Sequence, residues 1–142
     1  MINVKRLEPD EGSSARNAVR TVLLEEVSEA HLSRFLNSKE NYLIVAEKHG
    51  EAAGILLAYK LTRIRDEGAK LFIYEIEVRE SFRRQGIGTG LIEKIREIAK
   101  GQGVGTIFGL TNPAYGGAES FYENTGAEIQ ARNEILFTYK TG

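Results

Sequence analysis

A short turn with two arginines and two glycines indicates both the local fold of this chain and the kind of ligand that it can bind. The turn, Arg83-Arg84-Gln85-Gly86-Ile87-Gly88, separates two segments of different periodicity. The segment before it, Leu71 to Val78, is rich in Ile, Val, Phe and Tyr, which predicts a β-strand. From Gly88 to Lys100 apolar residues recur at helical spacing, which predicts a helix. The sequence therefore predicts a strand, a glycine turn and a helix, in that order.

A turn of this kind favours an anion. The first turn of a helix has backbone N–H groups without partners and the positive end of the peptide dipoles. Glycines let the oxygens of a ligand approach that backbone closely. The spacing Arg-x-x-Gly-x-Gly is neither the P-loop pattern nor the dinucleotide pattern Gly-x-Gly-x-x-Gly. We expect a phosphate site of another kind, and the alternative is an ordinary strand-to-helix turn with surface arginines.

The remaining segments predict a mixed α+β domain. A first helix carries the apolar residues from Ala15 to Val27, with Ser13 or Ser14 as its N-cap, and Ser28 caps a second short helix. A further short helix covers residues 118–124, and strands are expected over residues 2–7, 41–47, 52–61, 71–78, 106–110, 127–131 and 134–139. The last two strands would form a closing hairpin. We expect one domain over residues 1–142, with a mixed, mostly antiparallel central sheet and helices on both faces.

Composition excludes several classes of function. The chain has 142 residues, a formal net charge of −1, and 42% hydrophobic and 27% charged residues. This balance gives no general attraction to nucleic acid or to an anionic membrane. Cysteine is absent, which excludes disulfides, thiol nucleophiles and Cys-based zinc sites. No metal motif, signal peptide or membrane span is visible, so we expect a cytoplasmic protein without a metal.

The chain contains two motifs whose sequences and order resemble those of the GNAT superfamily of acetyl-CoA-dependent N-acetyltransferases. The first is the strand followed by Arg83-x-x-Gly86-x-Gly88, and the second is Ala118-x-x-Phe121-Tyr122-x-x-x-Gly126. The resemblance implies that the backbone of the turn holds the pyrophosphate of acetyl-CoA. It also implies that pantetheine lies where Ile76–Val78 and residues 108–110 splay apart. The implied cofactor-binding residues are Ile76, Val78, Arg83, Arg84, Gln85, Gly86, Ile87, Gly88, Thr89 and Asn112.

A narrower likeness concerns one branch of this superfamily. Residues 57–63, followed by residues 73–78, look like the aminoglycoside 3-N-acetyltransferase branch. One departure is the position seven residues before Tyr122, where the family pattern has Asn and this chain has Tyr115. The nearest asparagine is Asn112, so the loop over residues 113–117 is lengthened. This departure puts the usual pantetheine contact of Asn112 in doubt.

Two glutamates on the strand before the turn are the candidate general bases. An alkylamine has a pKa near 10.4, so it needs a base before it can attack a thioester. Strict alternation places Ile73, Glu75 and Glu77 on one face and Phe72, Tyr74, Ile76 and Val78 on the other. Proximity of the two carboxylates would raise the pKa of one of them. The family branch favours Glu75, and the alternative is that both are solvated residues on a half-exposed strand.

Two further groups complete the expected chemistry. Backbone N–H groups around Ile76 to Val78 would donate to the oxyanion where the strand is unpaired. The second family motif assigns the general acid to Tyr122, whose phenol pKa near 10 faces a thiol near 8.5. The alternative for Tyr122 is an amphipathic side chain that packs on one helix face with its hydroxyl at the rim.

The expected function is acetylation of a primary amine on a small, cationic, aminoglycoside-like acceptor, by direct attack in a ternary complex. Acidic residues that could line an acceptor cleft are Glu25, Glu26, Glu29, Asp66 and Glu67, or these are solvated charges balanced by Arg63, Arg65 and Lys70. Acetylation of a protein N-terminus or lysine, and a non-catalytic acyl-CoA-binding module, stay as alternatives. The closing strands could present the edge of a homodimer.

Overall fold

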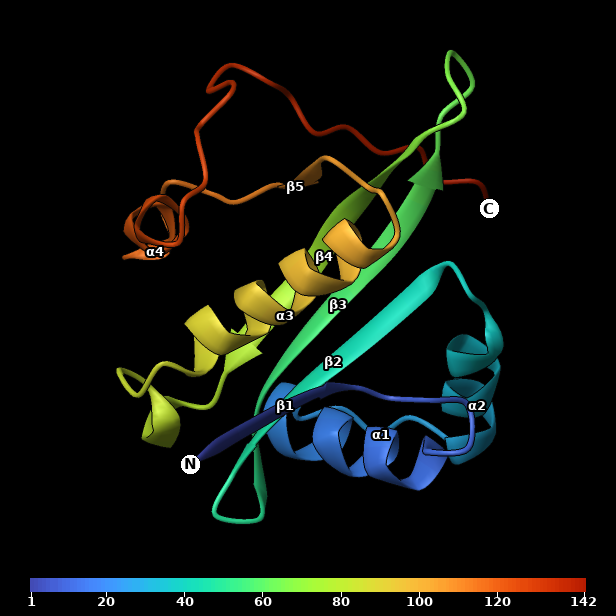
Figure 1. Ribbon diagram of the computed structural model, residues 1–142, viewed down its shortest axis with the longest axis vertical. Coiled ribbons are helices and arrows are strands. Elements are labelled where there is room, and N and C mark those ends of the chain that lie inside the picture. The colour runs from blue at the N-terminus through green and yellow to red at the C-terminus, as the bar shows by residue number, and fades with distance from the viewer. The chain divides into compact units, whose positions relative to one another are not determined.

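The computed structural model describes residues 1–142, which divide into two compact units, Met1–Leu110 and Thr111–Gly142. The first unit contains a five-stranded sheet in the order β1-β2-β3-β4-β5 (Figure 1). The strands are β1 (Ile2–Arg6), β2 (Asn41–Lys48), β3 (Glu51–Thr62), β4 (Ala69–Val78) and β5 (Ile107–Gly109). Strands β1 to β4 pair antiparallel with one another and β5 pairs parallel with β4, which confirms the predicted mixed, mostly antiparallel sheet.

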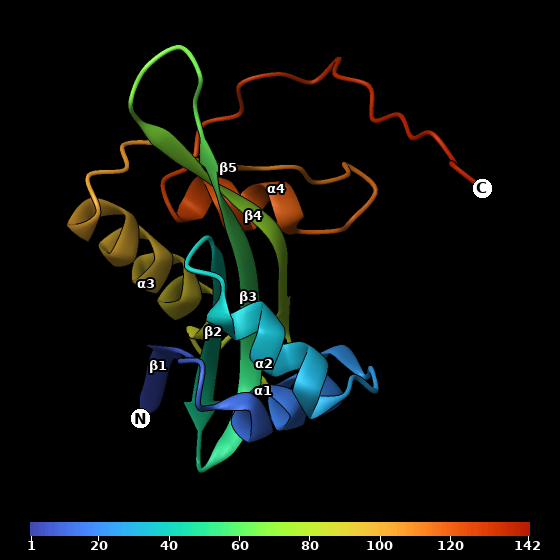
Figure 2. The ribbon, with the colours of Figure 1, turned by 90° about the vertical axis from the view of Figure 1, so that its right-hand side faces the viewer.

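Helices cover both faces of this sheet, as predicted. The N-terminal pair is α1 (Gly12–Ala18), which continues as a π-helical turn over Val19–Leu23, and α2 (Glu29–Asn37). The third helix is α3 (Ile87–Gly101), which follows a short 3-10 turn over Glu80–Phe82. Figure 2 shows α3 on one side of the strands and α1 with α2 on the other. No helix is long and apolar enough to cross a membrane.

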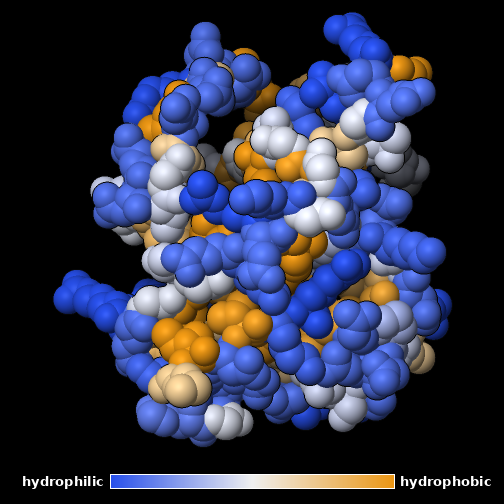
Figure 3. Space-filling view, viewed as in Figure 1, coloured by the Kyte–Doolittle hydropathy of each residue, from blue (hydrophilic) through white to orange (hydrophobic).

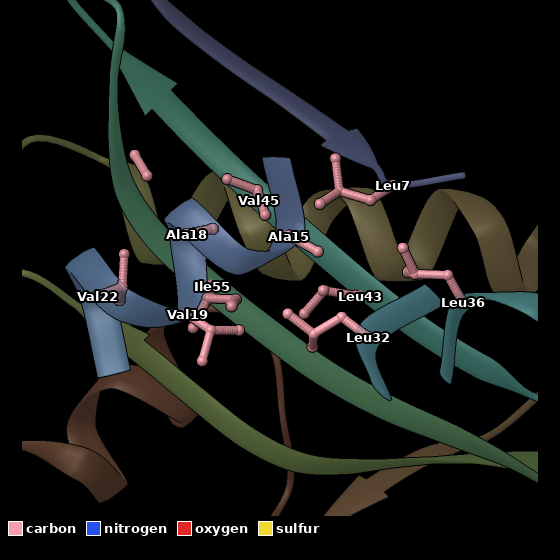
Figure 4. Close-up of a cluster of buried hydrophobic side chains, with 11 residues drawn as sticks. Leu7, Ala15, Ala18, Val19, Val22, Leu32, Leu36, Leu43, Val45 and Ile55 are labelled. Carbon is pink, nitrogen blue, oxygen red and sulfur yellow. The ribbon is translucent and has the colours of Figure 1, made fainter. Parts of the chain in front are cut away.

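The face under α1 and α2 holds a cluster of buried apolar side chains (Figure 4). The helices contribute small or branched residues at helical spacing, and the strands contribute alternate residues, as amphipathic elements do. The cluster consists of Leu7, Ala15, Ala18, Val19, Val22, Leu32, Leu36, Leu43, Val45, Ala52 and Ile55. This packing fixes the N-terminal helices on the sheet. The face of the molecule in Figure 3 is mostly hydrophilic, with hydrophobic residues visible in patches between the charged ones.

The opposite face holds α3, which packs closely on β3 because of one glycine. A Cβ built on Gly54 would lie 2.6 Å from Ile87 Cγ2 and 3.1 Å from Leu91 Cδ1. Both of these side chains are buried and belong to the first turns of α3. The glycine therefore sets how closely the start of α3 approaches the sheet, and with it the position of the turn that precedes the helix.

We expect Gly54→Ala to destabilise the protein by about 1–3 kcal/mol, because the new methyl group overpacks the contact with Ile87 and Leu91. The matched control is Gly101→Ala in α3, where a Cβ meets nothing within 4 Å. That change should leave stability unchanged or raise it by up to about 1 kcal/mol. Urea unfolding of both variants measures the difference, and equal stabilities would show that the close packing at Gly54 does not matter.

Of the two N-caps predicted from the sequence, only the cap of α2 is confirmed. Ser28 Oγ accepts a hydrogen bond from the backbone N–H of His31 at 3.1 Å, which confirms Ser28 as the N-cap of α2. The prediction of Ser13 or Ser14 as the cap of α1 was wrong, because the N-cap is Glu11 and the helix begins at Gly12. The Glu11 carboxylate instead accepts hydrogen bonds from the Lys5 ammonium and from the backbone N–H of Glu8.

The second unit contains α4 (Ala118–Asn124) and no strand. The predicted closing hairpin over residues 127–131 and 134–139 was therefore wrong as a structural assignment. Both segments are exposed and irregular, with Ile135, Leu136 and Phe137 more than two-thirds exposed. A two-stranded hairpin without a covered face is marginal at best, so alternation alone does not make these segments a sheet.

Candidate active site

The arginine-glycine turn has a left-handed backbone conformation at two positions just before α3 begins. Arg84 has φ 63° and Gly86 has φ 82°, both in the left-handed region. Gly86 is the N-cap of α3, and no side chain caps this helix. A residue without a Cβ adopts this conformation at little cost, which explains the glycine. The turn thus leads directly into the positive end of a helix of 15 residues.

The amides of this turn have no partner in the protein. From Arg84 to Thr89 no backbone N–H donates a hydrogen bond within the protein, whereas the N–H of Gly90 donates to Gly86 O at 3.0 Å. Six consecutive free donors at a helix N-terminus are a fitting cradle for a diphosphate. The residues that the sequence predicted for this role, Arg84, Gln85, Gly86, Ile87, Gly88 and Thr89, are the ones that carry these amides.

Side chains around the turn add positive charge and anchor it. Ile87 is buried and ties the start of α3 to the sheet, while Arg83, Arg84 and Gln85 are exposed. The ammonium group of Lys48, at the end of β2, donates to Gln85 Oε1. Sequence reasoning missed Lys48 because it lies 37 residues away along the chain. Only the register of the β2–β3 hairpin, whose turn has positive φ at His49 and Gly50, brings it there.

A β-bulge in β4 changes the predicted distribution of side chains between the faces. Leu57 of β3 pairs with Glu75 and the next residue, Ala58, pairs with Ile73, so Tyr74 is an inserted residue. Paired residues share a face, so Glu75 and Phe72 lie with Leu57 and Tyr59 on the face of α1 and α2. The structure keeps Glu75 and Glu77 together. The prediction that placed Ile73 with them and Phe72 opposite was wrong, because strict alternation does not allow for a bulge.

The two glutamates differ in their surroundings. The Arg83 guanidinium lies 3.3 Å from Glu77 Oε1 and also donates to the carbonyl oxygen of Val78. No such cation contacts Glu75, which is exposed. Partial desolvation raises the pKa of Glu75, and the negative charges of Glu77 and Glu25 raise it further. The raised pKa and the absence of a contacting cation make Glu75 the stronger candidate for the general base.

Strands β4 and β5 separate beside these residues. Their parallel pairing covers only Leu71 with Ile107, Phe72 with Phe108 and Ile73 with Gly109. Beyond Ile73, β4 continues to Val78 without β5 beside it. This is the predicted splay, and Ile76 and Val78 lie along it as half-buried residues on the side of α3. Backbone N–H groups at such an unpaired edge are available to a ligand.

Two of the five acidic residues suggested for an acceptor cleft form ion pairs, and a third acts on Glu75. Glu26 pairs with Arg20 at 2.7 Å, and Asp66 pairs with Arg63 at 3.3 Å. Glu25, which follows the π-helical turn and the left-handed Leu24, instead adds its negative charge to the environment of Glu75. No group of three or more His, Cys, Asp or Glu side chains is arranged to hold a metal ion.

Tyr122 and Asn112 belong to the second unit, Thr111–Gly142. Tyr122 lies in α4, where its ring contacts Phe121 at 5.2 Å. Burial raises the pKa of the Tyr122 phenol above 10, so its proton is held at neutral pH. Asn112 Oδ1 accepts a hydrogen bond from the backbone N–H of Ala114 at 2.9 Å, which makes this side chain part of a turn. The roles predicted for both residues stay predictions.

Both a family model and solved structures relate this chain to acetyltransferases. The model of the acetyltransferase (GNAT) family matches residues 12–127. Curated protein sequences gave no match. Among solved structures, the aminoglycoside acetyltransferase HMB0005 from an uncultured soil metagenomic sample is 25% identical, with a TM-score of 0.85 over 98% of this chain and 99% of that chain.

Two other solved structures share the fold at lower identity. The aminoglycoside N-acetyltransferase AAC(6')-Iy in complex with CoA is 19% identical, with a TM-score of 0.80 over 99% of this chain and 95% of that chain. A ribosomal-protein-alanine N-acetyltransferase from Brucella melitensis biovar Abortus 2308 is 14% identical, with a TM-score of 0.75 over the whole of both chains.

Proposed function

We propose that this chain, which belongs to the acetyltransferase (GNAT) family, transfers the acetyl group of acetyl-CoA to a primary amine of a small cationic acceptor. The observation that carries this proposal is the row of free amides from Arg84 to Thr89 at the N-terminus of α3. A diphosphate bound there would have its oxygens within reach of backbone donors and of the basic side chains nearby. A structure with the same fold contains CoA, which agrees with this assignment.

Each proposed residue has one chemical task. Acetyl-CoA supplies an acetyl group activated as a thioester. Glu75 takes the proton of the acceptor ammonium, directly or through water, and backbone N–H groups around Ile76 to Val78 donate to the developing oxyanion. The neutral amine attacks the thioester carbonyl, the amide C–N bond forms and the C–S bond breaks. Tyr122 gives a proton to the departing thiolate, and the second proton lost by the amide nitrogen returns to Tyr122 through water. The chain has no cysteine, so transfer is direct and passes through no cysteinyl intermediate.

The charges around Glu75 favour a cationic acceptor. Glu25 and Glu77 make the potential at this carboxylate more negative, which attracts an ammonium group. Similar proteins are named as aminoglycoside acetyltransferases, which supports an amine of this class. Acetylation of a protein N-terminus is the second candidate, because a ribosomal-protein-alanine acetyltransferase has the same fold.

Release of CoA thiol from acetyl-CoA across a panel of amines tests the proposal. The panel contains aminoglycosides, polyamines, amino acids and peptides with free N-termini. We expect thiol release with small cationic amines and little with peptides. Preference for peptides would favour the second candidate. Binding of CoA without thiol release from any amine would identify a non-catalytic binding module.

We expect Tyr122→Phe to lower kcat by about 10²-fold with little change in acetyl-CoA binding, because only the transferable proton is lost. The matched control is Tyr139→Phe, which removes a phenol from an exposed residue of the same unit. Steady-state thiol release and calorimetric binding measure the two effects. An unchanged kcat in Tyr122→Phe would remove Tyr122 from the mechanism.

A further inference from the structure

Five aromatic side chains form a continuous row across the sheet, on the face that carries Glu75. In order they are Phe35 of α2, Tyr59 of β3, Tyr74 and Phe72 of β4, and Phe108 of β5. Successive ring centroids lie 6.0, 5.8, 6.1 and 5.0 Å apart. The first three contacts are edge-to-face and the last is stacked, both favourable geometries. We refer to these five residues as the aromatic row.

None of the five rings is among the buried core residues, although Phe35 packs against the apolar cluster under α1 and α2. The rings are half-buried or exposed, and Tyr74 is 63% exposed while Phe108 is 39% exposed. Tyr74 is the inserted residue of the β4 bulge, so it has no partner on β3 that would fix its position by strand pairing alone. Rings held in order by one another and open to solvent form an apolar surface without a cover, which is typical of a binding site.

The charges beside the aromatic row select the kind of occupant. Glu75 directly follows Tyr74 and lies on the same face, and its negative charge acts on Tyr59. Glu77 and Glu25 add to this negative potential. At the other end of the row, the Lys70 ammonium lies 5.9 Å from the Phe108 ring centroid, so one ring already attracts a cation within the protein. Flat apolar faces beside carboxylates complement a molecule that carries an ammonium group on a ring.

We propose that the aromatic row is the acceptor-binding surface and that Tyr74 determines specificity, by selecting amines carried on a ring with an apolar face over flexible linear amines. This inference rests on the proposed acetyl transfer and narrows its substrate class. The ring packs on Tyr74 and its neighbours, and the ammonium group faces Glu75. A linear polyamine satisfies the carboxylates but gains little from the rings, and it loses more conformational entropy when it binds.

The test compares four amines: neamine, 2-phenylethylamine, spermidine and an alanyl peptide. We expect kcat/KM for neamine or 2-phenylethylamine to exceed that for spermidine by about tenfold or more. The comparison between the first two separates an amino sugar from an aryl amine. Tyr74→Ala should raise KM for the preferred ring amine about tenfold with a smaller change in kcat, while KM for spermidine changes little. Tyr74→Phe should restore KM, because the ring is retained.

The control is Tyr139→Ala, another exposed tyrosine that is outside the aromatic row, and it should leave every KM unchanged. Preference for spermidine, or a KM for the ring amine that is the same in Tyr74→Ala, would overturn the inference while leaving acetyl transfer intact. If none of the four amines releases thiol, the proposed function fails. Calorimetric binding of neamine and 2-phenylethylamine then decides the inference separately: tenfold weaker binding by Tyr74→Ala supports it, and equal or undetectable binding overturns it.

Discussion

Replacement of Glu75 by glutamine should lower kcat/KM for the acceptor by about 10²–10⁴-fold at neutral pH, because the group that takes the ammonium proton is lost. Glutamine has nearly the same shape, so the backbone of β4 and the neighbouring aromatic rings should stay in place. The variant should also be at least as stable as the wild type at pH 7. The carboxylate has a raised pKa in the folded protein, so its ionisation disfavours folding as pH rises through that pKa, and glutamine removes this effect.

The pH dependence of kcat/KM tests the role of Glu75 as general base in a second way. A general base must be deprotonated, so kcat/KM rises with pH through the pKa of Glu75 and the acidic limb should lie above that of an ordinary glutamate. Glu25→Gln removes one of the negative charges that raise this pKa, and it should move the limb to lower pH. Glu93→Gln, an exposed change on α3, should leave the limb unchanged.

Stopped assays of thiol release between pH 5 and 9 measure both effects. A Glu75→Gln variant that keeps its rate within about threefold at every pH would contradict the assignment of this base. A limb that stays in place in Glu25→Gln would show that the charge of Glu25 does not reach Glu75.

The second large effect is expected from Gly86→Val, which should weaken acetyl-CoA binding by about 100-fold or more. Gly86 has φ 82°, a conformation that a β-branched residue avoids, so the turn must change shape. The added Cβ would also lie 3.9 Å from Ile2 Cδ1, so the methyl groups beyond it add atoms beside the start of the turn. Both effects disturb the same row of amides, because Gly86 lies in its middle.

The control for this variant is Gly105→Val, at an exposed glycine without positive φ and without atoms within 4 Å of an added Cβ. Isothermal titration calorimetry with acetyl-CoA compares the two variants with the wild type, and circular dichroism verifies that both are folded. If Gly86→Val does not fold, Gly86→Ala serves as the milder test, with a smaller loss of affinity. A folded Gly86 variant with unaltered affinity would rule out the cradle.

The cradle could be predicted from sequence because its determinants are local. A strand, a glycine turn and an amphipathic helix are each encoded within about ten residues, and their succession fixes which amides are free. The same holds for the cap of α2 by Ser28, whose hydroxyl reaches an amide three residues ahead. The order of the first five strands and of the four helices was predictable for the same reason.

The remaining features depend on strand pairing and side-chain contacts that the local sequence pattern does not show. The bulge at Tyr74 is defined by how β4 pairs with β3, and alternation within one strand cannot show an inserted residue. The contact between Lys48 and Gln85, and the pairing of Glu77 with Arg83, result from the folded chain as well. The cap of α1 was missed because the helix already begins at Gly12, where the preceding Glu11 carboxylate accepts hydrogen bonds from Lys5 and Glu8 and no side chain caps the helix. The aromatic row combines three strands and a helix, so no single segment shows it.

The proposed acetyl transfer requires that the amides from Arg84 to Thr89 bind the diphosphate of acetyl-CoA. The most direct measurement is a titration of the ¹⁵N-labelled protein with CoA, followed by two-dimensional ¹H–¹⁵N NMR. We predict that these six amides show the largest shifts, downfield in the proton dimension, and that pantetheine without the nucleotide leaves them in place. If CoA binds while the resonances of these amides do not move and others do, the diphosphate does not bind to this turn.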